Sequence, residues 1–215
     1  MKKQIYNKLD KAIIPSLPRV IFKGRIIVIL TPGETEKAVD YLLKQEILGI
    51  DTETRPAFRK GMSFSVSLMQ ISTRDTCFLF RLNHTGLTPS LIRLLEDKNV
   101  LKVGLSLKDD MAALHKRSPF RPGNFEDLQQ RVSELGIEDL SLQKLYANLF
   151  GERISKTQRL SNWEADILTE KQKQYAATDA WACIQLHDEF NRLELTGDFD
   201  LIKKKEEILI DNEQL

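Results

Sequence analysis

Two acids, Asp51 and Glu53, stand at positions i and i+2 at the end of an apolar run that begins at Ile47. On a β-strand this spacing points both carboxylates to one face. Neighbouring carboxylates repel each other unless a cation or a shared proton lies between them, and divalent Mg²⁺ or Mn²⁺ prefers such oxygen ligands. The same spacing recurs in the polar tail at Asp211 and Glu213, so the spacing alone is weak. The apolar run before Asp51 favours a metal site, and a surface acid pair at a strand end is the alternative.

A further acid, Asp179, follows Tyr175 by four residues, so both side chains share one face of a helix. Alanines between and after them would let that face approach another element closely. An acid beside an apolar stripe needs a metal ion or a strong hydrogen-bond donor. The segment therefore indicates a further metal ligand at Asp179. The alternative is a Tyr-Asp hydrogen bond on a helix whose acid faces solvent.

A third candidate is the pair Asp109 and Asp110 at the start of a predicted helix. Ser106 is a suitable N-cap, and Asp109 then stands at the N3 position, where it can complete a capping box. That arrangement leaves Asp110 free to act as a ligand. Both acids could instead only stabilise the helix N-terminus electrostatically.

The strands that must position these acids come early in the chain. Runs of β-branched and apolar residues predict strands at 25–30, 47–51, 64–71, 76–80 and 100–103. The second to fourth of these are expected to form an antiparallel meander. Strands followed by strand-helix alternation predict an α/β fold, with a mixed sheet flanked by helices. Asp51 would end its strand, where open α/β sheets carry their sites.

Helical periodicity and capping signals predict six helices. They cover about 32–45, 88–95, 106–117, 128–135, 141–150 and 169–195. Capping boxes beginning at Thr31 and Thr169 mark the first and last of these helices. The loop at 152–168 is mostly polar and basic. The tail, 200–215, is expected to be a solvated helix or a frayed end.

The composition is that of an ordinary globular protein with a single domain. The 215 residues carry 32 Lys and Arg and 31 Asp and Glu, for a formal net charge of +1. This balance argues against a uniformly basic nucleic-acid coat but allows local patches. No apolar run of about 18 residues occurs, so no membrane partner is expected. No signal sequence follows the basic start, and Cys77 and Cys183 are expected to be reduced, apolar-packed thiols of a cytoplasmic protein.

The order of the three acidic motifs resembles the DEDDy 3′-5′ exonucleases of the ribonuclease H-like superfamily, and among them ribonuclease D and the exonuclease domain of the Werner syndrome helicase. The resemblance rests on Asp51-x-Glu53, on Lys102-Val103-Gly104 with Asp110, and on Tyr175-x-x-x-Asp179. Supporting segments are Leu68–Ile71, Ser141–Leu145 and Ser161–Glu164. The resemblance implies an exonuclease domain at 25–195, between an N-terminal extension at 1–24 and a C-terminal tail at 196–215.

The resemblance also implies a mechanism, in which nucleic acid is hydrolysed from the 3′ end to nucleoside 5′-monophosphates. Asp51, Glu53, Asp110 and Asp179 would bind two divalent metal ions, Mg²⁺ or Mn²⁺, about 4 Å apart around a scissile phosphate. Tyr175 would orient the attacking water through its hydroxyl. The register of the family's helix favours Asp110 over Asp109. These four acids and Tyr175 are the expected catalytic residues.

The expected partner is single-stranded or 3′-ended DNA or RNA, contacted by residues around the motifs. The candidates for these contacts are Thr52, Arg55, Phe58, Arg59, Lys60, Lys108 and Lys156. Phe58, with Met62 and Phe64, could stack on or wedge a terminal base. Further basic residues beside the motifs are Lys102, His115, Lys116, Arg117, Arg153 and Arg159. An ordinary solvated surface is the alternative for each basic cluster.

Two other functions compete with an exonuclease. A nucleic-acid-binding module that has lost catalysis would lack at least one metal ligand, whereas all expected acids are present. A scaffold domain without nuclease chemistry would leave the helix face with Tyr175 and Asp179 unexplained.

Overall fold

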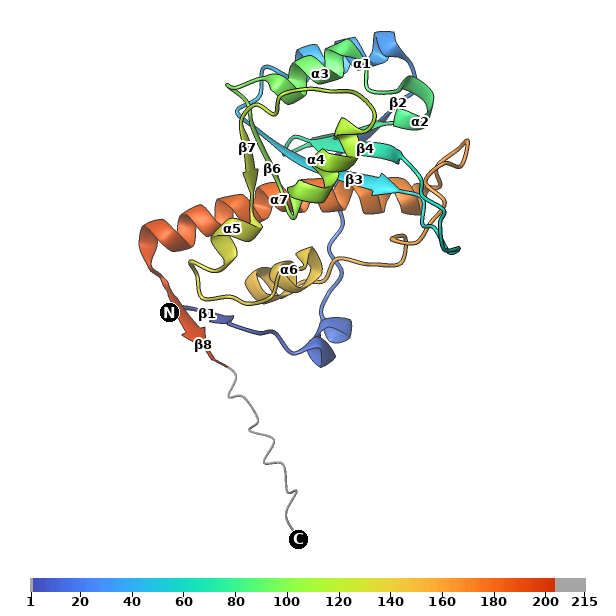
Figure 1. Cartoon of the computed structure of the whole chain (residues 1–215). Helices are drawn as coiled ribbons and strands as arrows, with labels where there is room; N and C mark the ends of the chain where they lie inside the picture. Colours follow the sequence, from blue (N-terminus) through green and yellow to red (C-terminus); the bar gives the residue numbers. More distant parts are fainter. Residues whose placement is uncertain (1, 204–215) are drawn as a thin grey trace.

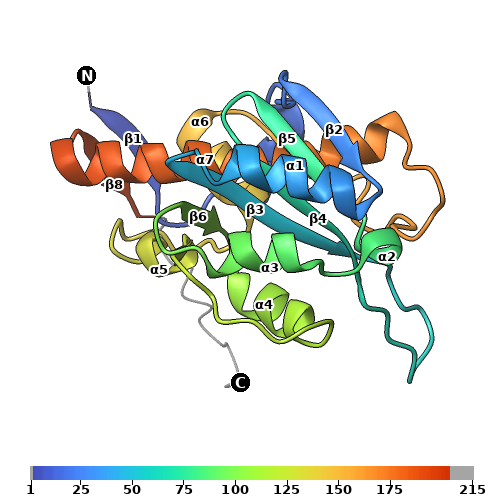
Figure 2. The same ribbon diagram turned by 90° about the horizontal axis from the view of Figure 1, so that it is seen from above.

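The computed structural model describes residues 2–203, which form a six-stranded mixed sheet with helices on both faces and a separate two-stranded sheet (Figures 1 and 2). The strand order of the larger sheet is β2-β5-β4-β3-β6-β7. Its strands are β2 (Arg25–Ile29), β3 (Ile47–Thr54), β4 (Val66–Ser72), β5 (Thr76–Phe80), β6 (Leu101–Gly104) and β7 (Phe125–Asp127). The predicted α/β architecture is therefore confirmed.

The predicted meander forms the middle of this sheet. β3 pairs antiparallel with β4, and β4 pairs antiparallel with β5. The other three strands pair parallel to their neighbours: β2 with β5, β6 with β3, and β7 with β6. A register shift between Glu53 and Thr54 disturbs the end of the β3-β4 pairing. β3 continues past Asp51, so Asp51 lies inside the strand rather than at its end.

Helices cover the two faces of the sheet with separate apolar clusters (Figure 1). α1 (Pro32–Leu42), α3 (Pro89–Glu96) and α4 (Leu107–His115) share one cluster with residues of β3, β4 and β5. The short α2 (Leu82–Thr85) follows β5. On the opposite face, the long α7 (Glu170–Thr196) packs on the sheet, with α6 (Leu142–Phe150) and α5 (Gln129–Val132) beside it.

Two of the three helix starts with a predicted capping box follow local rules. Both predicted capping boxes are present, at the N-terminus of α1 and of α7. α4 differs, because Ser106 has a left-handed backbone with φ of 64° and its side chain makes no capping hydrogen bond. The carboxylate of Asp127, at the end of β7, instead accepts hydrogen bonds from the backbone N–H groups of Ser106 and Leu107, both at 2.8 Å. The predicted capping box at Asp109 is therefore wrong.

α7 crosses β3 at very close range. A Cβ atom placed on Gly49 would lie 1.9 Å from the carbonyl oxygen of Ala180, so only glycine allows this contact. The neighbouring alanines of α7 are fully buried against the sheet. The predicted close approach of this helix face is thus confirmed, and it fixes the height of Asp179 over β3.

The first residues of the chain form structure that the sequence did not predict. β1 (Lys3–Tyr6) pairs parallel with β8 (Phe199–Ile202), and the 3₁₀ helix η1 (Lys11–Ser16) packs beside α6 (Figure 1). Ile5 is fully buried in the cluster around α7. β8 shows that the helix predicted for the tail is wrong at 200–202, and residues 204–215 of that tail lie outside the described residues.

Three further findings bear on the predictions. β7 was not predicted, and the helix predicted at 128–135 is shortened to α5. Cys77 and Cys183 are buried free thiols, as expected. Within the described range 2–203, no helix combines the length and the apolar character that crossing a bilayer would require.

Candidate active site

β3 and α7 bring three carboxylates together. Asp51 and Glu53 lie on the same face of β3 as Gly49, which is the face that α7 covers. Carboxylate oxygens of Asp51, Glu53 and Asp179 all lie within 4.8 Å of one another. Glu53 is 9% exposed and Asp179 is 6% exposed, whereas Asp51 is half-buried. A single cation could therefore contact all three residues, which we call the acidic triad.

Ionising the acidic triad is electrostatically costly without a cation. Burial, together with the charges of Asp179 and Asp110, raises the pKa of Asp51 well above its ordinary value. Burial and the charges of Asp51, Asp179 and Asp110 raise the pKa of Glu53 to about 10. Burial raises the pKa of Asp179 to about 7, although a hydrogen bond from Tyr175 and the charge of Lys156 act in the opposite direction. All three shifts indicate that positive charge is needed here at neutral pH.

Unpaired polar atoms accompany the triad. Oδ1 of Asp179 is buried and has no hydrogen-bond partner among residues 2–203. Gln70 on β4 lies directly opposite Asp51, and both polar atoms of its buried amide also lack a partner in the described part of the chain. A buried carboxylate oxygen without a donor is unfavourable unless an ion or water contacts it. The triad, with oxygen donors only, thus fits a hard divalent cation.

Tyr175 lies one turn before Asp179 on α7 and faces the same site. Burial raises the pKa of its phenol above the usual value, with further contributions from the charges of Asp179 and Glu53. Its ring packs against the fully buried ring of Trp163, with 6.0 Å between the two ring centroids. The hydroxyl is therefore protonated at neutral pH, and the packing on Trp163 fixes the position of the ring that carries it.

Asp110 reaches the site from the other face of the sheet. Thr52, between the two acids of β3, points away from α7 and donates its hydroxyl to the Asp110 carboxylate. Asp110 lies outside the group of mutually close oxygens, yet its charge raises the pKa of Asp51. Burial also raises the pKa of Asp110, and Asp109 is exposed. The structure thus brings together three of the four predicted ligands and places Asp110 beside them, held by Thr52.

Three of the predicted substrate contacts meet at a cavity of about 410 Å³ between the loop after β3 and the loop before α7. Its lining residues are Arg55, Pro56, Phe58, Arg59, Met62, Phe64, Leu160 and Asn162. The Arg55 guanidinium lies 4.8 Å from the centroid of the Phe64 ring and 3.2 Å from the carboxylate of Glu164. Phe58 is 80% exposed. Lys60 and Lys108 are exposed on the loop and on α4.

Lys156 belongs to a different hollow, which contains the triad's aspartate on α7. This cavity of about 290 Å³ has a wall formed by Ser141, Leu142, Gln143, Ile154, Ser155, Lys156, Arg159, Tyr175 and Asp179. The charge of Arg159 lowers the pKa of Glu53, and the charge of Lys156 lowers that of Asp179. Sequence reasoning did not single out Ser141 or Gln143 as site residues, because their only signal was a helix that resembles the family's.

Several basic residues near the motifs form hydrogen bonds with backbone carbonyls. Lys102 is fully buried and donates to the carbonyls of Asp97 and Val100, both at 2.8 Å, so its role as a nucleic-acid contact is excluded. Three others bind backbone carbonyls through their side chains: His115 with Phe120, Arg117 with Val66, and Arg153 with Leu17. A buried or bonded cation is indistinguishable from a surface one in sequence.

Comparisons with known proteins bear on this site. Residues 26–194 match the model of a family described as 3′-5′ exonuclease. The chain is 31% identical over 188 residues to a 3′-5′ exonuclease of Arabidopsis thaliana, across 80% of this chain and 65% of that protein. It is 28% identical over 204 residues to the bifunctional 3′-5′ exonuclease/ATP-dependent helicase WRN of Mus musculus, across 90% of this chain and 15% of that protein. The chain thus spans less than two thirds of either relative.

A solved structure supports the fold. The EXO domain of Nibbler from Aedes aegypti is similar with a TM-score of 0.72 at 20% sequence identity, over 90% of this chain and 94% of that domain. At this identity the likeness concerns the fold alone, and it confirms the predicted arrangement of a mixed sheet with flanking helices.

Proposed function

The chain belongs to the 3′-5′ exonuclease family, and from this premise we propose that it hydrolyses nucleic acid from the 3′ end in a metal-dependent reaction that releases nucleoside 5′-monophosphates. The acidic triad is the observation that carries the proposal. Three carboxylates within 4.8 Å of one another, two of them buried, have no structural use without positive charge between them. Because both relatives are longer than this chain, the proposal concerns the activity of the exonuclease domain alone.

Divalent metal ions fit this group of side chains. Asp51, Glu53 and Asp179 would hold one ion. Asp110 would help to hold a second, if its carboxylate gave up the hydrogen bond from Thr52. We propose Mg²⁺ or Mn²⁺, two per chain. When bound, such ions lower the pKa of a coordinated water and neutralise charge that develops on a phosphodiester.

Tyr175 would position the attacking water. Its phenol stays protonated at neutral pH because burial raises its pKa, so it acts as a hydrogen-bond donor and acceptor rather than as an ionised base. The hydrogen bond to Asp179 and the ring of Trp163 fix the direction of the hydroxyl. Tyr175 therefore orients the nucleophile and does not remove its proton.

Residues around the triad would bind a single strand of DNA or RNA by its 3′ end. Phe58, Met62 and Phe64 offer apolar surface to the terminal base, and Arg55 and Arg59 offer charge to its phosphates. Lys156 lines the cavity that contains Asp179, while Lys60 and Lys108 are exposed cations. Thr52 acts through Asp110 and is better described as a positioning residue.

The experiment that tests the proposal compares single-stranded oligonucleotides labelled at the 5′ end, with either a free or a blocked 3′ hydroxyl. In Mg²⁺ or Mn²⁺ we expect a ladder of shortened 5′-labelled products from the free end and none from the blocked end. Chromatography of the released nucleotides should identify 5′-monophosphates. Tight binding without any metal-dependent ladder would instead support the binding module that lacks catalysis.

A further inference from the structure

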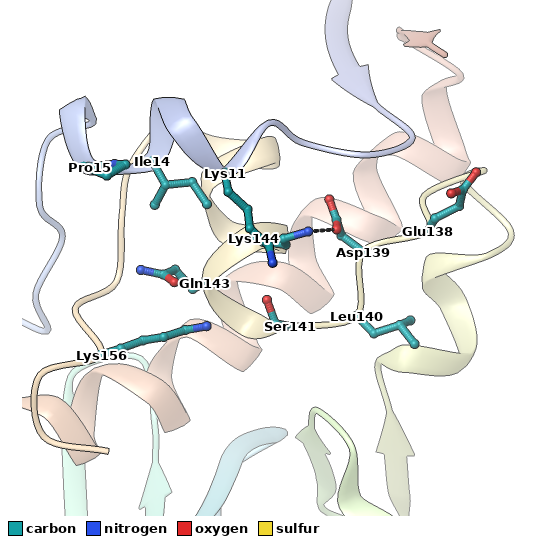
Figure 3. A pocket seen from close by; sticks show the side chains of 10 residues that line it. All are labelled: Lys11, Ile14, Pro15, Glu138, Asp139, Leu140, Ser141, Gln143, Lys144 and Lys156. Carbon is teal, nitrogen blue, oxygen red and sulfur yellow. Dashed lines mark hydrogen bonds and ion pairs between the residues drawn. The ribbon is translucent and has the colours of Figure 1, made fainter. Parts of the chain in front are cut away.

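A hollow that adjoins the triad contains three lysines, and two of them, Lys11 and Lys144, have no part in the proposed reaction. It measures about 620 Å³ and lies between η1 and the segment that leads into α6 (Figure 3). Lys11, Lys144 and Lys156 line it, and Figure 3 shows the side chain of Lys156 extending toward Ser141. We call this hollow the lysine cavity.

The lysine cavity adjoins the site. Ser141, Gln143 and Lys156 line both the lysine cavity and the smaller hollow that contains Tyr175 and Asp179. The two hollows therefore share one wall at the start of α6. A polymer whose 3′ end lies at the triad could continue into the lysine cavity without crossing a separate element.

The lining holds three lysines and two acids, Glu138 and Asp139, so the charges inside the cavity are only partly balanced. Lys144 forms an ion pair with the buried Asp139, whose carboxylate also accepts the backbone N–H of Leu9 at 2.7 Å. Among the residues that the structure describes, neither Lys11 nor Lys156 forms an ion pair. Burial and the charges of Arg159, Lys11 and Lys144 lower the pKa of Lys156, although the charge of Asp179 acts in the opposite direction, so these cations lie near enough to repel one another. An anion in the cavity would relieve that repulsion.

A hydroxyl at the shared wall has no protein partner. Ser141 precedes the first turn of α6, and its side chain makes no capping hydrogen bond. Its buried Oγ has no partner within residues 2–203. The amide of Gln143 is different, since it already donates to the carbonyl of Ile154 at 2.9 Å. Ser141 thus presents an unused donor beside the partial positive charge of a helix N-terminus.

We propose that the lysine cavity binds a backbone phosphate of the substrate strand, upstream of the 3′-terminal nucleotide. Lys11 and Lys156 supply the charge, Ser141 donates to a phosphate oxygen, and Ile14, Pro15 and Leu140 provide apolar surface for a sugar or base. The inference rests on the proposed function for the position of the 3′ end. Lys11 comes from the N-terminal segment, outside the residues 26–194 that match the family, so this contact would be particular to chains with such a segment.

The test compares two substrates in the full chain. The p-nitrophenyl ester of thymidine 5′-monophosphate has a single phosphodiester and cannot extend from the triad, whereas a single-stranded 12-mer can. For Lys11→Gln, the ratio of kcat/KM for the 12-mer to that for the ester should fall about five-fold, the size of one charged contact. Lys37→Gln is the control, because Lys37 is an exposed lysine of α1 on the opposite face of the sheet, and it should change neither value.

Binding of the 12-mer without metal provides a second readout that does not depend on turnover. The slope of log Kd against log salt should decrease in magnitude by about 0.7 in Lys11→Gln, as expected for one lost phosphate contact on a single strand. An unchanged ratio and an unchanged slope would overturn the proposal. A wild-type chain that cleaves neither substrate would refute the exonuclease function, and the salt slope would still decide whether the cavity binds the strand.

Discussion

The three acids of the triad oppose folding when no cation is present. Their raised pKa values mean that the folded chain favours the protonated acids. The contribution of these protonated acids to the free energy of unfolding is complete below the unfolded pKa values of 3.8 for Asp179 and 4.5 for Glu53. It is lost as the pH rises, first through about 7, where Asp179 ionises in the folded chain, and then through about 10, where Glu53 does. Without metal, the site is therefore less stable at neutral pH than at acidic pH.

The loss of stability with rising pH gives a prediction for the metal-free protein. In EDTA, Tm should fall as the pH rises from about 5 to about 8, and a loss of about 2 kcal/mol would correspond to about 4–8 °C. Added Mn²⁺ should raise Tm more at the higher pH, because the carboxylates must be ionised to bind it. Differential scanning calorimetry at a series of pH values measures both effects. A metal-free Tm that does not change between these pH values would contradict the proposed electrostatics.

Tyr175 should matter for turnover more than for metal binding. Tyr175→Phe keeps the ring that packs on Trp163 and removes only the hydroxyl that bonds to Asp179. We expect kcat to fall about 10²-fold, the usual effect of losing a group that orients a reacting water. The rise in Tm on adding Mn²⁺ should persist in the variant. Loss of that rise together with activity would assign Tyr175 to holding the metal site instead.

At the scale of the elements, β3 organises the site because its side chains alternate between two faces. Gly49, Asp51 and Glu53 face α7, while Thr52 faces α4 and holds Asp110. One strand thus connects ligands from two helices that lie on opposite faces of the sheet. Small shifts of α7 against β3 would separate Asp179 from the other two acids.

Gly49→Ala tests how tightly this crossing is constrained. The new Cβ would meet the carbonyl oxygen of Ala180 at 1.9 Å, and overpacking of this kind costs about 1–3 kcal/mol of unfolding free energy. Gly33→Ala on α1 is the matched control, since its added Cβ would meet no other described part of the chain within 4 Å apart from its sequence neighbours and its own helix backbone. The control should be neutral or stabilising by up to about 1 kcal/mol. Urea denaturation compares the two, and equal stabilities would show that α7 is free to move.

The elements that could be predicted are those with local causes. The capping boxes of α1 and α7 were predictable because each involves residues three positions apart. The start of α4 was not, because Ser106 and Leu107 are held by Asp127, about 20 residues later. β7 has only three residues, too few to show a period. The pairing of β1 with β8 joins the two ends of the described chain and has no local signal.

The residues of the site likewise divide into those with a local signal in the sequence and those brought together from distant segments. Spacing within one strand or one helix turn pairs Asp51 with Glu53, and Tyr175 with Asp179, and the resemblance of the ordered motifs to a family selected these pairs. The bond between Thr52 and Asp110 joins distant segments, as do the hollows that combine η1 with α6. Neither could be inferred from spacing. Lys102 shows the opposite error, because a cation buried against carbonyl oxygens has the same letter as a surface cation.

At the scale of the whole molecule, the N-terminal segment is part of the packed structure. Ile5 is fully buried against the cluster around α7, although it lies outside the predicted exonuclease domain at 25–195. Ile5→Ala should therefore lower the unfolding free energy by about 2–4 kcal/mol. Ile13→Ala is the control, because that side chain is 43% exposed, and it should cost about 0.5 kcal/mol or less. Similar small effects in both variants would mean that the segment only rests on the domain.

The net charge of +1 conceals a strong separation of charge within the molecule. The acids gather between β3 and α7, while cations line two separate hollows, Arg55 and Arg59 in one and Lys11 and Lys156 in the other. A cation bound by the triad would make the whole region attractive to phosphate. Local placement of charge, not its sum, indicates a polyanionic substrate.

The central claim is that the acidic triad, with bound metal, hydrolyses nucleic acid at its 3′ end. It is tested most directly by the rate at which mononucleotides leave the 3′ end of a single strand in Mg²⁺, measured for the wild type and for Asp179→Asn. The substitution keeps the shape and removes the charge, so several kcal/mol of transition-state stabilisation should be lost and the rate should fall about 10³-fold or more. The metal-free variant should also be more stable than the wild type at pH 8, which shows that it is folded. Release at the wild-type rate by a folded Asp179→Asn variant would contradict the account.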